Sequence, residues 1–211
     1  MKQLQDVIKE SILDDEDDLI NNSEQSAIIY SIFKELTETY GKICVLEPTG
    51  PSTFQGDIPL TIDNIVLDKK NRLKFVNIPK NYRVYLDLSS VGVLDCMRQY
   101  GIVCLDSPLV IMGFQRGNGY YKLSALNIRE VDKIILKNCR IEIDKFPKIH
   151  NEIYFYTCDL YPFKKPSSLP KGCDIKFNDD TCVILSGEWL KRFCNKQDYQ
   201  SDIKGNRIFK L

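Results

Sequence analysis

The sequence predicts an α/β protein in which short N-terminal helices are followed by an irregular solenoid with a parallel sheet. Two observations indicate this fold. Apolar residues within the first 40 positions recur at helical spacing. From residue 60 onward, a phrase of alternating apolar residues recurs at intervals of 19 to 26 residues. Intervals in this range suit a solenoid with one short strand and one return segment in each coil.

Residues 1–22 form an acidic leader segment. Leu4, Val7 or Ile8, and Ile12 lie about one turn apart, which predicts a short amphipathic helix. The run DDEDD follows at 14–18. Carboxylates are unfavourable near the partial negative charge of a helix C-terminus, so we expect this helix to end near Leu13.

Residues 23–41 predict a second amphipathic helix. Ser23 is the expected N-cap and Gly41 the expected C-cap. The apolar face is predicted to consist of Ile28, Ile32 and Leu36, with Ile29 and Phe33 beside it. Residues 42–59 contain the turn-rich stretch EPTGPSTFQGDIP and are expected to connect this helix to the repeats.

Residues 60–185 contain the recurring phrase: apolar, skip one, apolar, skip two, apolar or cysteine, skip one, apolar. The phrases begin at Leu60, Leu86, Leu109, Ile134, Ile153 and Ile175. The first two positions would face the core from a strand, and the third, after a turn, would point a small side chain into the same core. Asn138 and Thr157 are expected to adopt the turns beside Cys139 and Cys158 and to satisfy backbone amides there. The segment from Val93 to Gly101 predicts a short helix between two phrases.

Residues 186–211 are expected to cap the last coil. In EWLKRF, the apolar residues Trp189, Leu190 and Phe193 have the spacing of an amphipathic helix. The same region carries the basic stretches KRFCNKQ and KGNRIFKL, which leaves nucleic-acid binding open as an alternative. The formal net charge of zero argues against that alternative.

The phrases IILKNCRI and IYFYTCDL resemble leucine-rich repeats, with isoleucine and aromatic residues at many leucine positions. The Phe-Pro pair at 146–147 and the Leu-Pro pair at 169–170 contribute to this resemblance. It implies a leucine-rich-repeat-like solenoid that binds another protein.

The opening IKESILDDEDDLI resembles the leader of many otherwise unrelated proteins from crAss-like and related tailed phages of gut Bacteroidales. A leader shared by unrelated proteins implies an address or docking tag, and virion packaging is one such role. The chain is then expected in the cytoplasm of the host or in the virion. No apolar run approaches the roughly 20 residues that span a bilayer, so no membrane partner is expected.

The eight cysteines form no CxxC pair, so we expect buried thiols and no metal site or cofactor. An enzymatic alternative remains, in which Cys139 or Cys158 acts as a nucleophile with His150, the single histidine. A cysteine on a core-facing position lacks the charged partner that would make it reactive. We therefore favour a non-enzymatic protein-interaction or structural module of unknown oligomeric state.

The strand residues between the core positions are expected to point outward and to form the contact surface for a partner. These candidate binding residues are Lys133, Lys137, Arg140, Glu152, Tyr154, Tyr156, Lys176 and Asn178.

Overall fold

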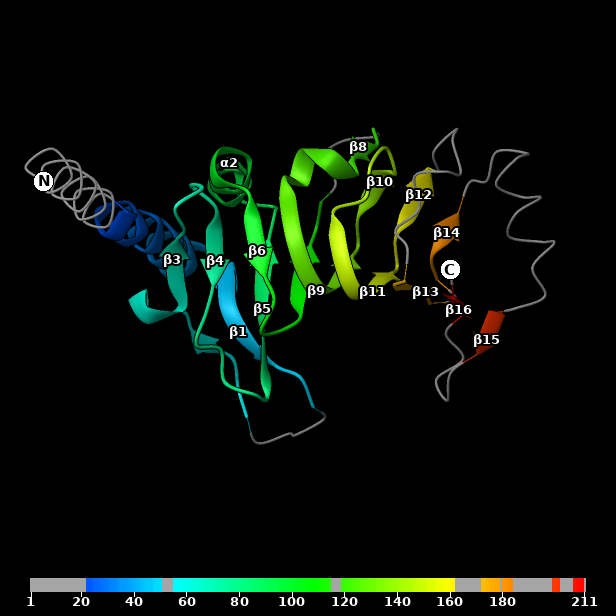
Figure 1. The fold of residues 1–211 in the computed structure, drawn as a ribbon, viewed down its shortest axis with the longest axis horizontal. Coiled ribbons are helices and arrows are strands. Elements are labelled where there is room, and N and C mark those ends of the chain that lie inside the picture. The colour runs from blue at the N-terminus through cyan, green and yellow to red at the C-terminus, as the bar shows by residue number, and fades with distance from the viewer. Residues whose placement is uncertain are drawn as a thin grey trace, which may run out of the picture.

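The computed structural model describes residues 22–50, 55–114, 119–161, 172–178, 180–183, 199–201 and 207–210. The acidic run at 14–18 and the proposed capping residues Trp189, Leu190 and Phe193 lie outside the described residues, as do both C-terminal basic stretches except for residues 207–210. In the described part the chain is of mixed α/β class, and its long, mostly parallel sheet curls along the molecule (Figure 1).

The helix over residues 22–40 agrees closely with the helix expected at 23–41 and lies at the N-terminal end of the sheet (Figure 1). Gly41 ends it with a φ of 85°, and its N–H donates to the Thr37 carbonyl at 2.9 Å. Two details differ from expectation. Residue 22 is already helical, so Ser23 is not the N-cap. Of the predicted apolar residues, Ile29 and Phe33 are buried whereas Ile28 is 51% exposed, so the covered face of the helix is centred on Ile29 and Phe33.

Two short strands occupy the segment expected to be a connector. β1 (Cys44–Pro48) pairs antiparallel with both β2 (Ile58–Pro59) and β5 (Tyr82–Asp87). Pro59 has no N–H, and β2 forms the end of the main path of strands. Proline at a sheet edge removes a donor that would otherwise invite pairing with another chain.

The long sheet contains twelve of the strands that the structure describes, and its centre is parallel. The parallel run consists of β5, β7 (Leu109–Met112), β9 (Ile128–Lys137), β11 (Lys148–Tyr156) and β13 (Asp174–Phe177). Beyond β13 the order continues with β16 (Arg207–Lys210) and β15 (Tyr199–Ser201), which are antiparallel.

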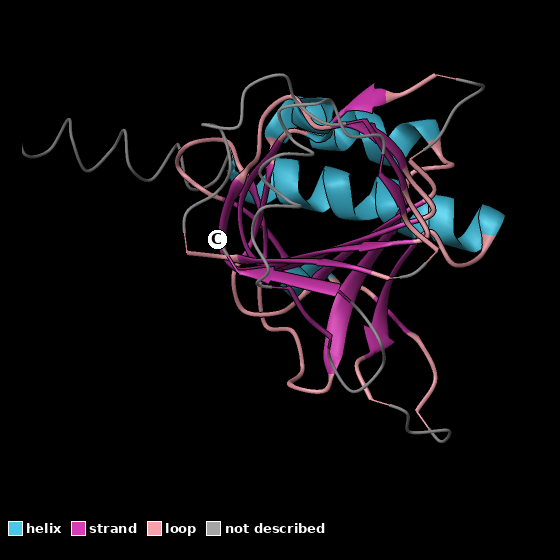
Figure 2. Cartoon of the chain, turned by 90° about the vertical axis from the view of Figure 1, so that its right-hand side faces the viewer, coloured by secondary structure: helices cyan, strands magenta, loops and turns pink. Residues whose placement is uncertain are grey.

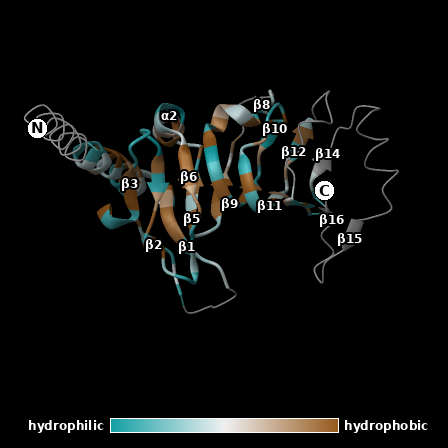
Figure 3. Ribbon diagram, viewed as in Figure 1, coloured by the Kyte–Doolittle hydropathy of each residue, from teal (hydrophilic) through white to brown (hydrophobic). Residues whose placement is uncertain are grey.

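A second sheet has only parallel neighbours, and a view along the molecule shows strands and helices arranged around a central interior (Figure 2). This second sheet consists of β8 (Tyr121–Lys122), β10 (Arg140–Glu142), β12 (Asp159–Tyr161) and β14 (Cys182–Val183). The chain alternates between the sheets, because β10, β12 and β14 directly follow β9, β11 and β13. Buried residues of both sheets, such as Leu136 and Ile141, belong to one apolar cluster, and Figure 3 shows hydrophobic residues along the strands.

The register of the parallel strands confirms most of the predicted rows. Leu109 pairs with Ile134, Ile134 with Ile153, and Ile153 with Ile175. All four side chains are buried. The second positions form a matching buried row of Ile111, Leu136, Phe155 and Phe177, whose last two rings stack with centroids 5.5 Å apart.

The first two predicted phrases are placed wrongly. Val84, not Leu86, pairs with Leu109, so the phrase at 86 is displaced by two residues. The phrase at 60 lies outside the parallel run, because Ile62 begins the 3₁₀ helix η1 (Ile62–Asn64) and is 42% exposed. An alternating pattern is identical after a shift of two residues, so it cannot fix this register.

The residues after η1 form a hairpin of β3 (Ile65–Leu67) and β4 (Leu73–Phe75), and β4 also pairs with β6 (Ile102–Cys104). β3 lies at an edge, but two of its donors are already used. The Ile65 N–H donates to the Ile62 carbonyl, and the Leu67 N–H donates to Ser26 Oγ at 3.0 Å. This edge is therefore poorly suited to accept a further strand.

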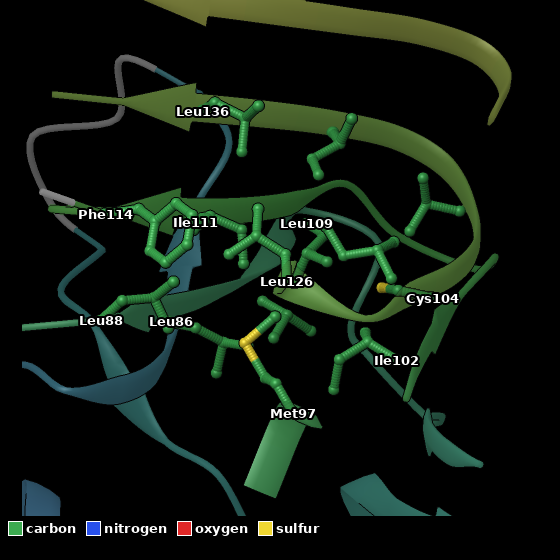
Figure 4. Packing of buried hydrophobic residues seen from close by; sticks show 14 of the residues in the cluster. Leu86, Leu88, Met97, Ile102, Cys104, Leu109, Ile111, Phe114, Leu126 and Leu136 are labelled. Carbon is green, nitrogen blue, oxygen red and sulfur yellow. The ribbon is translucent and has the colours of Figure 1, made fainter. Parts of the chain in front are cut away.

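The predicted short helix is confirmed as α2 (Val91–Tyr100), closed by Gly101 with a φ of 68°. The turn η2 (Leu123–Leu126) lies against it and ends at Asn127, which is left-handed with a φ of 49°. Asn127 Nδ2 donates to the Met97 carbonyl at 3.0 Å and to the Arg98 carbonyl at 2.8 Å. Met97 and Leu126 enter the same buried cluster, whose packing Figure 4 shows.

Candidate functional site

The candidate site is the outer face of the long sheet, centred on β9. Alternate residues of a strand point to opposite faces. Because Ile134 and Leu136 are buried in the core, Lys133, Ile135 and Lys137 point to the outside.

An apolar stripe crosses this outer face from strand to strand. It follows the register through Val45, Tyr85, Val110, Ile135 and Tyr154. Val45, Tyr85 and Val110 form a small buried cluster, separate from the main core, against which Met112 and Ile135 pack.

Ion pairs cover the end of the stripe on β1 and β5. Lys42 Nζ lies 3.0 Å from both Glu47 and Asp57, and Arg83 Nε lies 2.7 Å from Glu47. Burial alone would raise the pKa of Glu47, but the hydrogen bond from Lys42 and the charge of Arg83 bring it below its usual value. Lys42 Nζ also lies 4.6 Å from the centre of the Tyr85 ring, and burial raises the pKa of Tyr85 to about 12. The cations at this end are therefore compensated.

The lysines of β9 differ from those cations. Within the described part of the chain, neither Lys133 nor Lys137 forms an ion pair. Burial lowers the pKa of Lys137, and the attraction of Glu47 does not offset this effect. Glu152 lies opposite Lys133 in the register, but its carboxylate contacts Lys176 at 2.5 Å instead.

Aromatic residues border β9 on its other side. Tyr154 and Tyr156 both project from the outer face of β11, with ring centroids 5.9 Å apart in an edge-on arrangement. Tyr156 is 43% exposed. Together, these residues define what we call the β9 patch, which comprises Met112, Lys133, Ile135, Lys137, Tyr154 and Tyr156 and lies over the buried Val110.

The structure brings six of the eight sequence-predicted contact residues onto this one face. They are Lys133, Lys137, Glu152, Tyr154, Tyr156 and Lys176. Arg140 lies in the second sheet, where it pairs with Asp159 at 3.2 Å and lies over the Tyr120 ring.

The outward placement predicted for Asn178 is wrong, because this residue is buried after the end of β13. Its Oδ1 accepts hydrogen bonds from the Thr157 N–H at 2.8 Å and from Thr181 Oγ1 at 2.6 Å. Asn178 therefore joins neighbouring turns instead of facing a partner.

Sequence reasoning missed the apolar members of the β9 patch, Met112 and Ile135. A signal was present in IILK, where Ile135 interrupts the alternation between Ile134 and Leu136. An apolar residue at an outward position of a strand is the informative exception to the alternating pattern.

The structure does not bring together the residues of the enzymatic alternative. Cys139 and Cys158 lie in the turns after β9 and β11, where Cys139 Sγ donates to the Lys137 carbonyl and Cys158 Sγ to the Leu136 carbonyl, each at 3.1 Å. The contact with Cys158 and burial hold the pKa of Cys139 well above its usual value. His150 lies near the start of β11 and contacts Glu130 at 2.8 Å. His150 and Tyr156 are six positions apart along β11, which corresponds to roughly 20 Å.

The turns beside the cysteines have the geometry expected of them. Asn138 and Thr157 are left-handed, with φ values of 50° and 52°. The Asn138 N–H donates to the Tyr156 carbonyl at 3.0 Å, so this turn is bonded to the next strand along the sheet. All six cysteines whose side chains are described are buried.

The described residues hold neither a cluster of metal-ligating side chains nor a membrane-spanning helix. No group of three or more histidine, cysteine, aspartate or glutamate side chains is arranged to hold a metal ion there. Over the same residues, no helix is long and apolar enough to cross a membrane.

The sequence matches no protein-family model, no curated protein and no solved structure at a significant level. A function for this chain therefore has to be inferred from its own residues.

Proposed function

We propose that this chain is a non-enzymatic protein-interaction module that binds its partner through the β9 patch. The observation that carries this proposal is the composition of the patch. Two tyrosines, a methionine and an isoleucine lie together on an outer sheet face, beside two lysines that form no ion pair with any residue the structure describes. Aromatic residues and methionine are enriched in protein–protein interfaces.

The proposal includes the architecture that presents the patch. The alternation of the chain between two parallel sheets supports coils of a leucine-rich-repeat-like solenoid, in which β9 with β10 and β11 with β12 form successive turns. A solenoid offers one extended face made of equivalent positions from neighbouring coils, and such faces commonly carry the binding residues. The β9 patch occupies positions of this kind.

The role in the host follows from the resemblance of the leader. We propose that IKESILDDEDDLI directs the chain to a phage particle, so that the module acts in or on the virion. Mass spectrometry of purified particles and of the soluble lysate tests this part. Enrichment in particles supports it, whereas detection in the lysate alone contradicts it.

The contact surface is tested by co-purification from cells that produce the protein. Tyr156→Ala and Lys137→Glu change exposed or half-buried side chains on the patch, and both variants are expected to lose the co-purifying partner. Lys145→Glu is the matched control, because Lys145 is exposed in the segment between β10 and β11 and its side chain forms no described ion pair. Unchanged recovery of every partner with both patch variants would refute the surface.

A further inference from the structure

The geometry of β9 suggests which chemistry the β9 patch recognises, and this inference rests on the proposed function. Lys133, Ile135 and Lys137 occupy successive outward positions of one strand. At the rise of a β-strand, the two lysine backbones lie about 13 Å apart. In a second extended chain that runs along β9, alternate side chains have the same spacing. Its residues i, i+2 and i+4 could therefore contact Lys133, Ile135 and Lys137 in turn.

Among the residues that the structure describes, Lys133 and Lys137 lack the direct ion pairs that the neighbouring cations form. Lys42 and Arg83 pair with Glu47, and Lys176 pairs with Glu152. Lys137 is half-buried among the apolar residues of the patch, with Met112 and Tyr156 as its register neighbours. A half-buried ammonium group that forms no direct ion pair in the described part of the chain is unfavourable, and an anion from a partner would relieve that cost.

The residues beside Ile135 indicate which kind of partner side chain would fit between Lys133 and Lys137. Val110 is its neighbour on β7 and Tyr154 its neighbour on β11. Met112 packs against the same small cluster. Val110 is itself fully buried, so an apolar side chain placed over Ile135 would bury surface against Met112 on β7 and Tyr154 on β11, which favours binding by roughly 25 cal/mol per Å².

We propose that the β9 patch binds an acidic segment of a partner protein in an extended conformation, with carboxylates at positions i and i+4 and an apolar side chain at i+2. The carboxylates pair with Lys133 and Lys137, and the apolar side chain covers Ile135. Charge-assisted hydrogen bonds of this kind are among the stronger polar contacts that a surface can make.

The charges on the rest of the face favour an acidic peptide over a nucleic acid. Single-stranded nucleic acid needs a positively charged groove that follows its backbone. Here Glu47, Glu152 and Asp174 lie on the same outer face, and the chain as a whole has no net charge. Two isolated cations, separated by an apolar residue, suit two discrete carboxylates better than a continuous line of phosphates.

The test is a titration of the ¹⁵N-labelled full-length chain, followed by NMR chemical shifts. The probe is the capped peptide Asp-Thr-Leu-Thr-Asp, added to about 5 mM, where dissociation constants near 1 mM are measurable. We expect saturable shifts in β9 and at Tyr154. The double variant K133E/K137E should weaken this binding by about tenfold or more, and should instead bind the charge-reversed peptide Lys-Thr-Leu-Thr-Lys. Lys145→Glu should bind as the unaltered chain does.

Three results would overturn the inference. The first is the absence of saturable shifts in a chain whose spectrum is that of a folded protein. The second is equal binding by the unaltered chain and K133E/K137E. The third is that a ten-residue oligothymidylate shifts the patch while the acidic peptide does not. If the peptide fails while partner co-purification still depends on Tyr156, the proposed function survives and only the chemistry assigned to the partner is wrong.

Discussion

At the scale of single residues, Lys137 is the most informative position. It is a cation on a sheet face where burial lowers its pKa and where it forms no ion pair within the described chain. Neighbouring cations on the same face are paired. Residues that lower stability without an evident structural return are expected at functional sites.

The first prediction concerns Lys137→Met, which keeps the apolar stem and removes the charge. We expect the free energy of unfolding of this variant to exceed that of the unaltered chain by about 0.5–1 kcal/mol. The same variant should lose binding of the acidic peptide. Urea denaturation measures the gain. Lys145→Met, at an exposed position, should change stability by less than about 0.5 kcal/mol.

The gain should also depend on pH. Because the pKa of Lys137 is lower in the folded than in the unfolded chain, the unfolded chain binds more protons between those two values. This group therefore makes stability rise as the pH increases through that window, and Lys137→Met should lack this rise. A gain that is absent at neutral pH would contradict the interpretation of Lys137 as an unfavourable charge.

At the scale of single elements, the left-handed residues connect segments that are distant in the sequence. Asn127 combines a φ of 49° with two hydrogen bonds from its side chain to the last turn of α2. Asparagine adopts this conformation at lower cost than most residues, since its short polar side chain can bond locally. One side chain thus both shapes the turn and satisfies carbonyls at a helix end.

The second prediction separates these two roles of Asn127. Asn127→Ala should lower the free energy of unfolding by about 2 kcal/mol, because it loses the hydrogen bonds and strains the backbone. Asn127→Gly loses only the hydrogen bonds and should cost about 1 kcal/mol. Equal losses in the two variants, measured by urea denaturation, would show that the left-handed backbone contributes nothing.

The third prediction concerns the face of the helix over residues 22–40. Phe33 is almost fully buried, so Phe33→Ala should cost about 3–4 kcal/mol. Ile28 is mostly exposed, and Ile28→Ala should cost less than about 0.5 kcal/mol. Thermal unfolding of the two variants checks this contrast, and a larger loss for Ile28→Ala would mean that another face of the helix is covered.

At the scale of the whole molecule, the sequence predicts the parallel rows well and their N-terminal neighbours poorly. The rows through Ile134 and Leu136 were predictable, because every strand of a parallel run repeats the same inward positions. Ile62 fits the same apolar spacing but lies in η1. The prediction failed there because spacing alone does not distinguish a strand from a turn before a hairpin.

The candidate site was predictable only in part, for a related reason. The outward direction of Lys133 and Lys137 follows from the alternation of β9. Their lack of a direct ion pair within the described chain does not follow from it, because ion pairing depends on which acids the register places beside the lysines and on how those acids turn. Glu152 illustrates this point, since it lies opposite Lys133 but contacts Lys176.

The central claim is that the β9 patch is the surface that meets a partner, and site-specific photocrosslinking tests it most directly. In one variant, a photoreactive phenylalanine derivative would replace Tyr156, which is 43% exposed on the patch. In a separate variant it would replace Tyr40, which is 69% exposed at the end of the helix over residues 22–40. In cells that produce the protein, the account predicts a crosslinked partner from position 156 that is absent from position 40 and is lost in K133E/K137E. A partner that crosslinks only from position 40, or no crosslink from position 156, would contradict it.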